Sequence, residues 1–175
     1  MSYEYSENIL VQESAGELLE KELGWEVAYA YNTEVLGADG TFGRRSYREV
    51  LLVRYFRRAL KTLNPWITDA QIDEAQQKLE SRLASASDMQ INEEKYFLIR
   101  DGIKVTVKTP DGKTASRTAR VVDFEHPEDM EKNHFLAIKE LKIHGNLHRR
   151  RTDIVGFVNG IPLVFMEFKK NTVDV

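Results

Sequence analysis

The chain has 175 residues, 42% of them hydrophobic, which is enough apolar material for one domain with a buried core. Its net charge is −3, so total charge does not attract it to nucleic acid, and any such affinity must be local. The chain has no cysteine, which excludes disulfides and thiolate metal sites and is typical of a reducing compartment. It also contains neither a secretory signal nor the roughly 18 to 20 apolar residues that span a bilayer. We therefore expect a cytoplasmic protein with no membrane association.

The N-terminal region predicts a helix followed by a strand. The helix is expected over about residues 7–23, and Gly24 is a suitable stop. Residues 25–32 then alternate as a strand does. A partial apolar stripe on the helix is formed by Ile9, Leu10, Leu18, Leu19 and Leu23.

Two further helices are indicated by capping-box spacing. Ser46 and Glu49 have this spacing and predict the start of a second helix, which Asn64 and Pro65 end. Thr68 and Gln71 repeat it and predict a third helix that ends near residue 84.

The C-terminal half predicts strands, because from residue 96 the apolar period changes to two. The segment 103–108 places Ile103, Val105 and Val107 on one face, and a Pro-Asp-Gly turn follows it. Further strands are expected over 118–124 and 133–143, and two more within 151–170. Helices therefore precede mostly antiparallel strands, which predicts a single α/β (α+β) domain over residues 1–175.

The stretch RTDIVGFVNGIPLVFMEFKK, residues 151–170, predicts a hairpin because Asn159-Gly160 lies between apolar runs. A plain two-residue turn places Asp153 and Glu167 on opposite faces of the sheet. A three-residue loop with Gly160 as a G1 bulge, or an equivalent one-residue irregularity, places Asp153, Glu167 and Lys169 on one face. We expect the bulge, with Gly160 at positive φ. Since both faces of the hairpin are apolar, we also expect both strands to be covered on both sides.

Asp153, Glu167 and Lys169 suit metal-assisted hydrolysis of a phosphodiester. Two carboxylates can hold Mg²⁺, and the backbone carbonyl of Phe168 can add a ligand. The metal lowers the pKa of a bound water, and Lys169 can orient that water or stabilise charge on the phosphate. The alternative is that Asp153 only keeps a strand end soluble and that Glu167 and Lys169 form an exposed, self-neutralising pair. The spacing by itself leaves both interpretations open.

The same stretch resembles the PD-(D/E)xK nuclease motif of the restriction (motor) subunit of type I restriction–modification enzymes. Residues 13–27, 48–75 and 121–141 also resemble segments of that family, in the same order. The residues that match its catalytic hairpin are Asp153, Asn159, Gly160, Pro162, Leu163, Glu167 and Lys169.

The resemblance implies a restriction-endonuclease-like mixed central sheet flanked by helices, and a Mg²⁺-dependent endonuclease that cleaves double-stranded DNA. Asp153 and Glu167 are then metal ligands, and Lys169 is the catalytic lysine. Glu13 matches an acidic position on the family's first helix that can face the metal, although a solvated helix residue is the favoured explanation. The holoenzyme that the family implies adds methylation and specificity subunits.

Two departures from the family pattern qualify the resemblance. Thr152 stands where proline is usual, and a threonine there can keep an extended backbone. A Gln-x-x-x-Tyr motif that often follows the hairpin has no counterpart in the sequence. We expect a fragment without the helicase motor, because no phosphate-binding loop is present, and ATP would act only through that motor.

Two basic clusters are candidates for DNA binding. One is a helical stripe at i, i+3, i+4 and i+7, which is also explained as a solvated face; it consists of Arg54, Arg57, Arg58 and Lys61. The other lies directly before Asp153 and consists of His148, Arg149, Arg150 and Arg151. Two alternatives to a type I nuclease domain remain: a repair nuclease of the same motif, and a non-catalytic module that docks a subunit or DNA.

Overall fold

The computed structural model describes residues 7–82, 86–126, 131–145 and 148–168. The chain divides into two compact units, of which unit 1 comprises residues 1–52 and 134–175 and unit 2 comprises residues 53–133. No helix in these described ranges is both long enough and apolar enough to cross a membrane. That residues 1–175 act as one nuclease domain stays a prediction.

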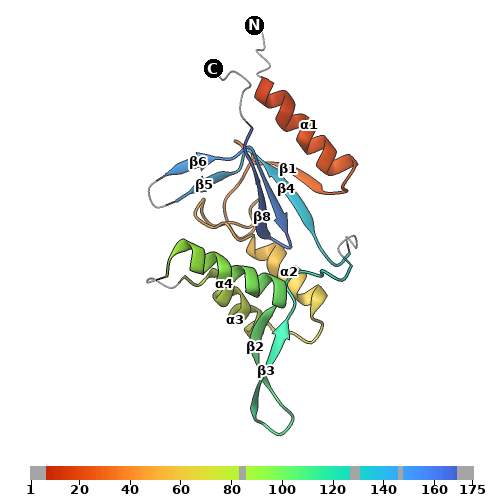
Figure 1. Ribbon diagram of the computed structural model, residues 1–175, viewed down its shortest axis with the longest axis vertical. Helices are drawn as coiled ribbons and strands as arrows, with labels where there is room; N and C mark the ends of the chain where they lie inside the picture. Colours follow the sequence, from red (N-terminus) through yellow and green to blue (C-terminus); the bar gives the residue numbers. More distant parts are fainter. Residues whose placement is uncertain (1–6, 83–85, 127–130, 146–147, 169–175) are drawn as a thin grey trace. The chain divides into compact units, whose positions relative to one another are not determined.

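A four-stranded mixed sheet is the centre of unit 1 (Figure 1). Its strand order is β1-β4-β7-β8, in which β1 runs parallel to β4 and the other neighbours are antiparallel. Helix α1 packs against β1 and β4. The bounds are α1 (Glu7–Lys21), β1 (Glu26–Tyr29), β4 (Phe135–Lys139), β7 (Ile154–Val158) and β8 (Ile161–Met166). The predicted mixed α/β class with a central sheet is confirmed.

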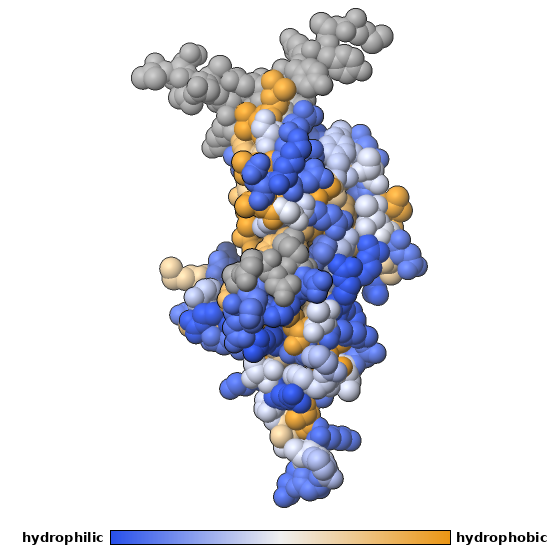
Figure 2. All heavy atoms as spheres, turned by 90° about the vertical axis from the view of Figure 1, so that its right-hand side faces the viewer, coloured by the Kyte–Doolittle hydropathy of each residue, from blue (hydrophilic) through white to orange (hydrophobic). Residues whose placement is uncertain are grey.

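Helix α1 buries a different face from the one that its leucines predict. Gln12, Gly16 and Leu19 are buried, and a Cβ on Gly16 would lie 3.4 Å from the Lys139 side chain. Leu10 and Leu18 are instead about half exposed, at 49% and 56%. Figure 2 faces this side of unit 1 and shows apolar and hydrophilic residues mixed on the surface. The predicted apolar stripe is thus confirmed at Leu19 and wrong at Leu10, Leu18 and Leu23, because a small residue at position 16 lets a different face approach the sheet closely.

The β7–β8 hairpin has a two-residue turn. Val158 pairs with Ile161, and Asn159 and Gly160 both have positive φ, at 53° and 79°, which is the type I′ pattern. The predicted G1 bulge at Gly160 was therefore wrong, while its positive φ is confirmed. The one-residue irregularity lies further along β8, because Gly156 pairs with Val164 but Phe157 pairs with Pro162. Leu163 is the extra residue, so the register still shifts by one.

Strand β7 lies inside the sheet, between β4 and β8, and all five of its residues are buried. Gly156 is required there because a Cβ would lie 2.8 Å from the Trp25 indole and 3.0 Å from Val164. Strand β8 is instead an edge strand, and its Leu163 and Phe165 are 45% and 57% exposed. The expectation that both strands are covered on both faces is thus confirmed for β7 and wrong for β8.

The described residues of unit 2 form three helices and a β-hairpin. Helix α3 begins at the predicted capping box of Thr68 and Gln71. It packs along β2, where Glu74 accepts a hydrogen bond from the Thr106 N–H and Lys78 donates one to the Lys104 carbonyl. The bounds are α2 (Val53–Leu63), α3 (Asp69–Glu80), α4 (Asp88–Asp101), β2 (Ile103–Lys108) and β3 (Thr114–Ala119).

Two of the sequence-based helix assignments need correction. Helix α2 begins at Val53, because Ser46 and Glu49 form a turn in which the Glu49 carboxylate accepts the Arg45 N–H at 2.8 Å. Helix α4 was missed, although Ser87 and Gln90 form a complete capping box at its start. The predicted strand over 133–143 is also interrupted, because Glu140 has a positive φ of 55°.

The Asn159 side chain stabilises the hairpin that positions Asp153 and Glu167. It is fully buried, and its Oδ1 accepts the His134 N–H at 2.7 Å. We expect Asn159→Ala to lower the free energy of unfolding by about 2 to 4 kcal/mol, because it removes the acceptor of a partly buried N–H and places alanine in a left-handed conformation. Urea denaturation measures this loss.

Asn32→Ala is the matched control for this substitution. Asn32 also has a positive φ, at 60°, but its side chain is exposed. We expect a loss of about 1 kcal/mol, from backbone conformation alone. Equal losses in the two variants would contradict a role for the Asn159 amide.

Candidate active site

Asp153 and Glu167 lie at the same end of the β7–β8 hairpin. Ile154 pairs with Met166 at the end of the ladder, and extending this register by one residue sets Asp153 opposite Glu167. Side chains alternate along strands, and directly opposed residues share a face. The shifted register at Leu163 therefore gives the two carboxylates the common face that a plain hairpin register denies them.

Two backbone N–H groups and one side-chain amide hold the Asp153 segment in place. The Asp153 Oδ2 accepts a hydrogen bond from the Phe168 N–H at 2.6 Å. The Asp153 carbonyl accepts hydrogen bonds from the Glu140 N–H at 2.9 Å and from the Gln12 Nε2 at 2.7 Å. These contacts anchor the aspartate to the residue after β4, to α1 and to the residue after Glu167. A carboxylate retains further lone pairs for a cation.

The predicted site residues differ in how far the structure describes them. Asp153 is partly buried, Glu167 is exposed, and Lys169 lies outside the described residues. Phe168 packs partly against a buried cluster that includes Leu19 and Ile154. The proposed ligation by the Phe168 carbonyl stays a prediction.

Glu13 lies on the exposed side of α1, and its neighbour Gln12 makes the contact with the Asp153 segment. A role for Glu13 in metal binding stays a prediction. The sequence did not single out Gln12. The available signal was that Gln12 lies on the same helix face as Gly16 and Leu19. A polar side chain on a buried face needs a hydrogen-bond partner, which here is the Asp153 carbonyl.

The basic residues before Asp153 form a second hairpin in unit 1, made of β5 (Lys142–His144) and β6 (Arg149–Arg151) (Figure 1). The register pairs Lys142 with Arg151 and His144 with Arg149, so these four side chains share one side, which we call the basic face. Arg150 pairs with Ile143 on the opposite side. The sequence did not indicate this separation of Arg150 from its neighbours.

Tyrosine rings lie against the basic face. The Lys142 Nζ lies 5.0 Å from the centroid of the Tyr31 ring, and the Arg151 guanidinium carbon lies 4.7 Å from it. The Tyr47 ring packs against the His144 imidazole with centroids 4.9 Å apart. These contacts are within the range of cation–π and aromatic packing, so they hold the basic side chains in defined positions.

The electrostatic environment of His144 is positive. Burial lowers the pKa of its imidazole, and four nearby cations lower it further. These cations are Arg149, Arg48, Lys142 and Arg44. With this lowered pKa, the His144 imidazole stays neutral near pH 7, because burial and the neighbouring cations disfavour its protonated form.

Arg44 is a buried cation and not part of a solvated basic segment. Its side chain is fully buried and forms a bidentate pair with the Glu34 carboxylate, at 2.8 and 2.7 Å. It also donates to the carbonyls of Glu49 and Lys142, at 3.1 and 3.2 Å. Arg44 thereby attaches β5 to the preceding loops, a role that composition and charge did not reveal.

The basic stripe on α2 is partly neutralised within unit 2. Arg57 pairs with Asp69 and Asp73 of α3, and Lys61 pairs with Asp69 at 2.9 Å. The guanidinium groups of Arg54 and Arg58 lie over the Tyr55 ring, at 5.3 and 5.5 Å. Contact of these four residues with DNA stays a prediction.

Asp123, Glu125 and His126 in unit 2 are a group that the sequence did not single out. Their potential ligand atoms lie within 4.8 Å of one another, as metal ligands do. However, the Lys132 Nζ lies 3.5 Å from the Asp123 carboxylate and 3.0 Å from the His126 Nδ1. Burial by itself would raise the pKa of Asp123, but hydrogen bonds from the Glu125 and His126 N–H groups outweigh it and lower that pKa. The group therefore stabilises its own loop.

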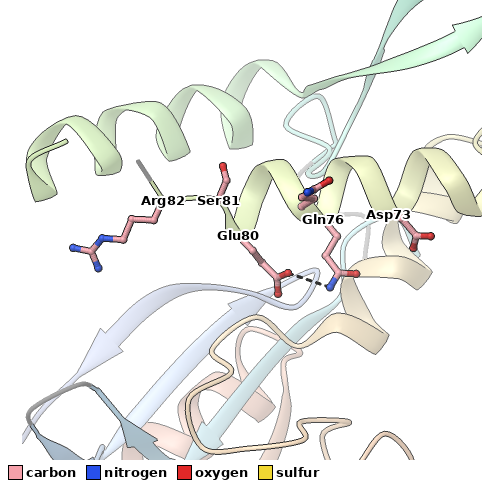
Figure 3. Close-up of a pocket in the computed structure, with 6 residues that line it drawn as sticks. Asp73, Gln76, Glu80, Ser81 and Arg82 are labelled. Atoms are coloured by element: carbon pink, nitrogen blue, oxygen red, sulfur yellow. Dashed lines mark hydrogen bonds between the residues drawn. The ribbon is translucent and has the colours of Figure 1, made fainter. Parts of the chain in front are cut away.

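A shallow hollow along α3 offers no catalytic arrangement. Figure 3 shows that the side chains lining it come from one helix and the residues just after it. The Gln76 Nε2 donates to the Glu80 carboxylate at 3.2 Å. The lining residues are Asp73, Gln76, Gln77, Glu80, Ser81 and Arg82.

With this geometry established, comparison with known proteins identifies the family. A model described as the type I restriction enzyme R protein N terminus matches residues 4–175, and the chain belongs to this family. The chain is 34% identical over 149 residues to the type I restriction enzyme HindI endonuclease subunit of Haemophilus influenzae, which covers 84% of the chain. It is 29% identical over 170 residues to a putative type I restriction enzyme MjaIXP endonuclease subunit of Methanocaldococcus jannaschii, which covers 94% of the chain.

The matched regions are only 13% and 15% of the lengths of these two relatives. No solved structure gives a significant match to the chain. The sequence resemblance to the N-terminal domain of type I restriction subunits is thus confirmed at the level of the family.

The positive environment of His144 has a measurable consequence. We expect Arg149→Ala to raise the pKa of His144 toward its ordinary value of 6.5, because it removes the cation that lowers this pKa most. NMR titration of the imidazole resonances measures the change. Arg150→Ala removes an equal charge from the other side of β6 and should change this pKa less. A larger change in Arg150→Ala would contradict the assigned faces.

Proposed function

We propose that this chain is the DNA-cleaving domain of a type I restriction enzyme R subunit and that it hydrolyses phosphodiester bonds with Mg²⁺. The observation that carries the proposal is the shifted register of the β7–β8 hairpin, which ends at the pair Ile154–Met166, directly before Asp153 and Glu167. Membership in the R protein N-terminus family supports the same function.

The residues at the hairpin end fit a hard divalent cation. Asp153 and Glu167 offer carboxylate oxygens, which Mg²⁺ prefers over nitrogen and sulfur. One Asp153 oxygen accepts the Phe168 N–H, which fixes the carboxylate and leaves other lone pairs for a ligand. When bound, the cation would lower the pKa of a coordinated water and neutralise charge on the phosphate.

Three residues have proposed roles in hydrolysis. Asp153 and Glu167 hold the cation, and Lys169 orients the attacking water and stabilises negative charge on the phosphate. Water adds to phosphorus as the bond to the leaving oxygen breaks, and that oxygen takes a proton. The Phe168 carbonyl and Glu13 are proposed as additional ligands.

The partners follow from the same proposal. Double-stranded DNA is the substrate, and His148, Arg149 and Arg151 lie just before Asp153, where cations can contact phosphates, whereas Arg150 belongs to the other side of β6. In a complete enzyme the chain would act with methylation and specificity subunits, and ATP would be used by a motor elsewhere. A cytoplasmic location agrees with this role.

Divalent metal binding is the first test. We expect the chain to bind Mn²⁺ or Ca²⁺ at millimolar concentration, and Asp153→Asn to abolish that binding because it removes a ligand charge. Isothermal titration calorimetry measures both proteins, and circular dichroism verifies their folding. If the folded wild-type chain binds no divalent ion, the catalytic proposal fails and a non-catalytic docking module explains the fold better.

Cleavage is the second test. We expect nicking of supercoiled plasmid with Mg²⁺ to fall about 100-fold or more in Lys169→Ala, because the proposed catalytic lysine is lost. Lys104→Ala is a control that removes an exposed lysine from β2 in unit 2. An equal loss in both variants, or full activity in Lys169→Ala, would contradict the role of Lys169.

A further inference from the structure

We infer that the basic face of the β5–β6 hairpin binds the phosphate backbone of duplex DNA, with Lys142 and Arg149 as principal contacts. This inference rests on the proposed function and specifies how its substrate is held. It adds Lys142 from β5 to the predicted DNA contacts and removes Arg150 from them.

The arrangement of like charges is the first argument. Lys142 lies directly opposite Arg151, and Arg149 adds a third cation to the same side of the hairpin. Like charges at directly opposed positions destabilise a sheet. Among the described residues, neither Lys142 nor Arg149 forms an ion pair, and Arg151 has the Glu140 carboxylate at 3.6 Å. A polyanion would supply the counter-charge that the face lacks.

The fixed positions of these cations are the second argument. Arg44 donates to the Lys142 carbonyl, and the His144 N–H donates to the Tyr47 carbonyl at 2.9 Å. The outer edge of β5 is therefore bonded to the preceding loop. Since Lys142 and Arg151 also lie against the Tyr31 ring, less conformational entropy is lost when they bind a ligand.

The tyrosines favour duplex backbone over single-stranded DNA. Base stacking needs an accessible ring face. The Tyr31 ring already lies against Lys142 and Arg151, and the Tyr47 ring lies against His144. These rings hold cations, so the face is built to contact phosphates and not unstacked bases.

The connection to Asp153 is the third argument. Arg151 precedes Asp153 by two residues, and Thr152 between them donates both its N–H and its hydroxyl to the Leu141 carbonyl, at 3.0 and 3.2 Å. The β5–β6 ladder thus continues to the position of Asp153. A backbone held by Lys142 and Arg149 would be guided along this ladder toward the proposed site of hydrolysis.

The test measures binding of a fluorescent DNA duplex by anisotropy, in EDTA and at several salt concentrations. We expect Lys142→Ala and Arg149→Ala each to weaken binding several-fold and to reduce the slope of log affinity against log salt by about 1, as loss of one phosphate contact does. Arg150→Ala is the matched control, with the same charge change on the other side of the same strand. We expect its affinity and slope to equal those of wild type.

Three results would overturn the inference. They are a loss in Arg150→Ala as large as in Arg149→Ala, tighter binding of a single strand than of the duplex, and displacement of the duplex by an acidic peptide at equal charge concentration. Equal losses in the two arginine variants would mean that binding depends on net charge alone. Tighter binding of a single strand would mean that bases are contacted, and displacement by an acidic peptide would mean that the face binds a protein partner. Thermal denaturation of each variant verifies that the hairpin remains folded.

Failure of this inference is distinguishable from failure of the proposed function. Binding is measured without metal and is repeated in Asp153→Asn, so it does not depend on hydrolysis. If face-specific binding is found while divalent ions do not bind, the chain contacts DNA without cleaving it. If metal-dependent nicking is found but Lys142→Ala and Arg149→Ala bind normally, DNA is held elsewhere.

Discussion

The hydrogen-bonded ladder that β7 forms with β4 and β8 is the constraint on which the candidate site depends. Every residue of β7 is buried, so the strand cannot slip without exposing its apolar side chains or burying the charge of Asp153. The type I′ turn at Asn159-Gly160 determines one end of the register with β8. The extra residue at Leu163 then determines which residues of β8 lie opposite Asp153.

The shift at Leu163 changes which face of the sheet the following residues occupy, and it does so without lengthening the turn. A regular ladder from the two-residue turn would place Glu167 on the face opposite Asp153. One extra residue in an edge strand corrects this, and edge strands tolerate such irregularities because their outer side has no partner strand. The central strand stays regular, which keeps its bonds to β4 intact.

Basic residues in unit 1 occur both buried and exposed. Arg44 is fully buried and satisfied by Glu34 and by backbone carbonyls, so it contributes to the fold and offers nothing to a ligand. The basic face instead keeps its cations at the surface and backs them with tyrosines. Arginines thus have a structural role when buried, as Arg44 does, and a proposed binding role when exposed on the basic face. The sequence does not distinguish the two kinds, because burial depends on the tertiary structure.

The sequence alone determined the family, the hairpin at Asn159-Gly160, the α3 cap and the mixed α/β class, because these depend on local motifs and on apolar period. Tertiary structure decided where the register shifts, which face of α1 is buried, and which arginines share a face. The shift at Leu163 depends on how β8 pairs with β7, and the orientation of α1 depends on how closely Gly16 approaches Lys139. The first joins neighbouring strands of one hairpin and the second joins residues far apart in the chain, and neither follows from the apolar period of a single segment.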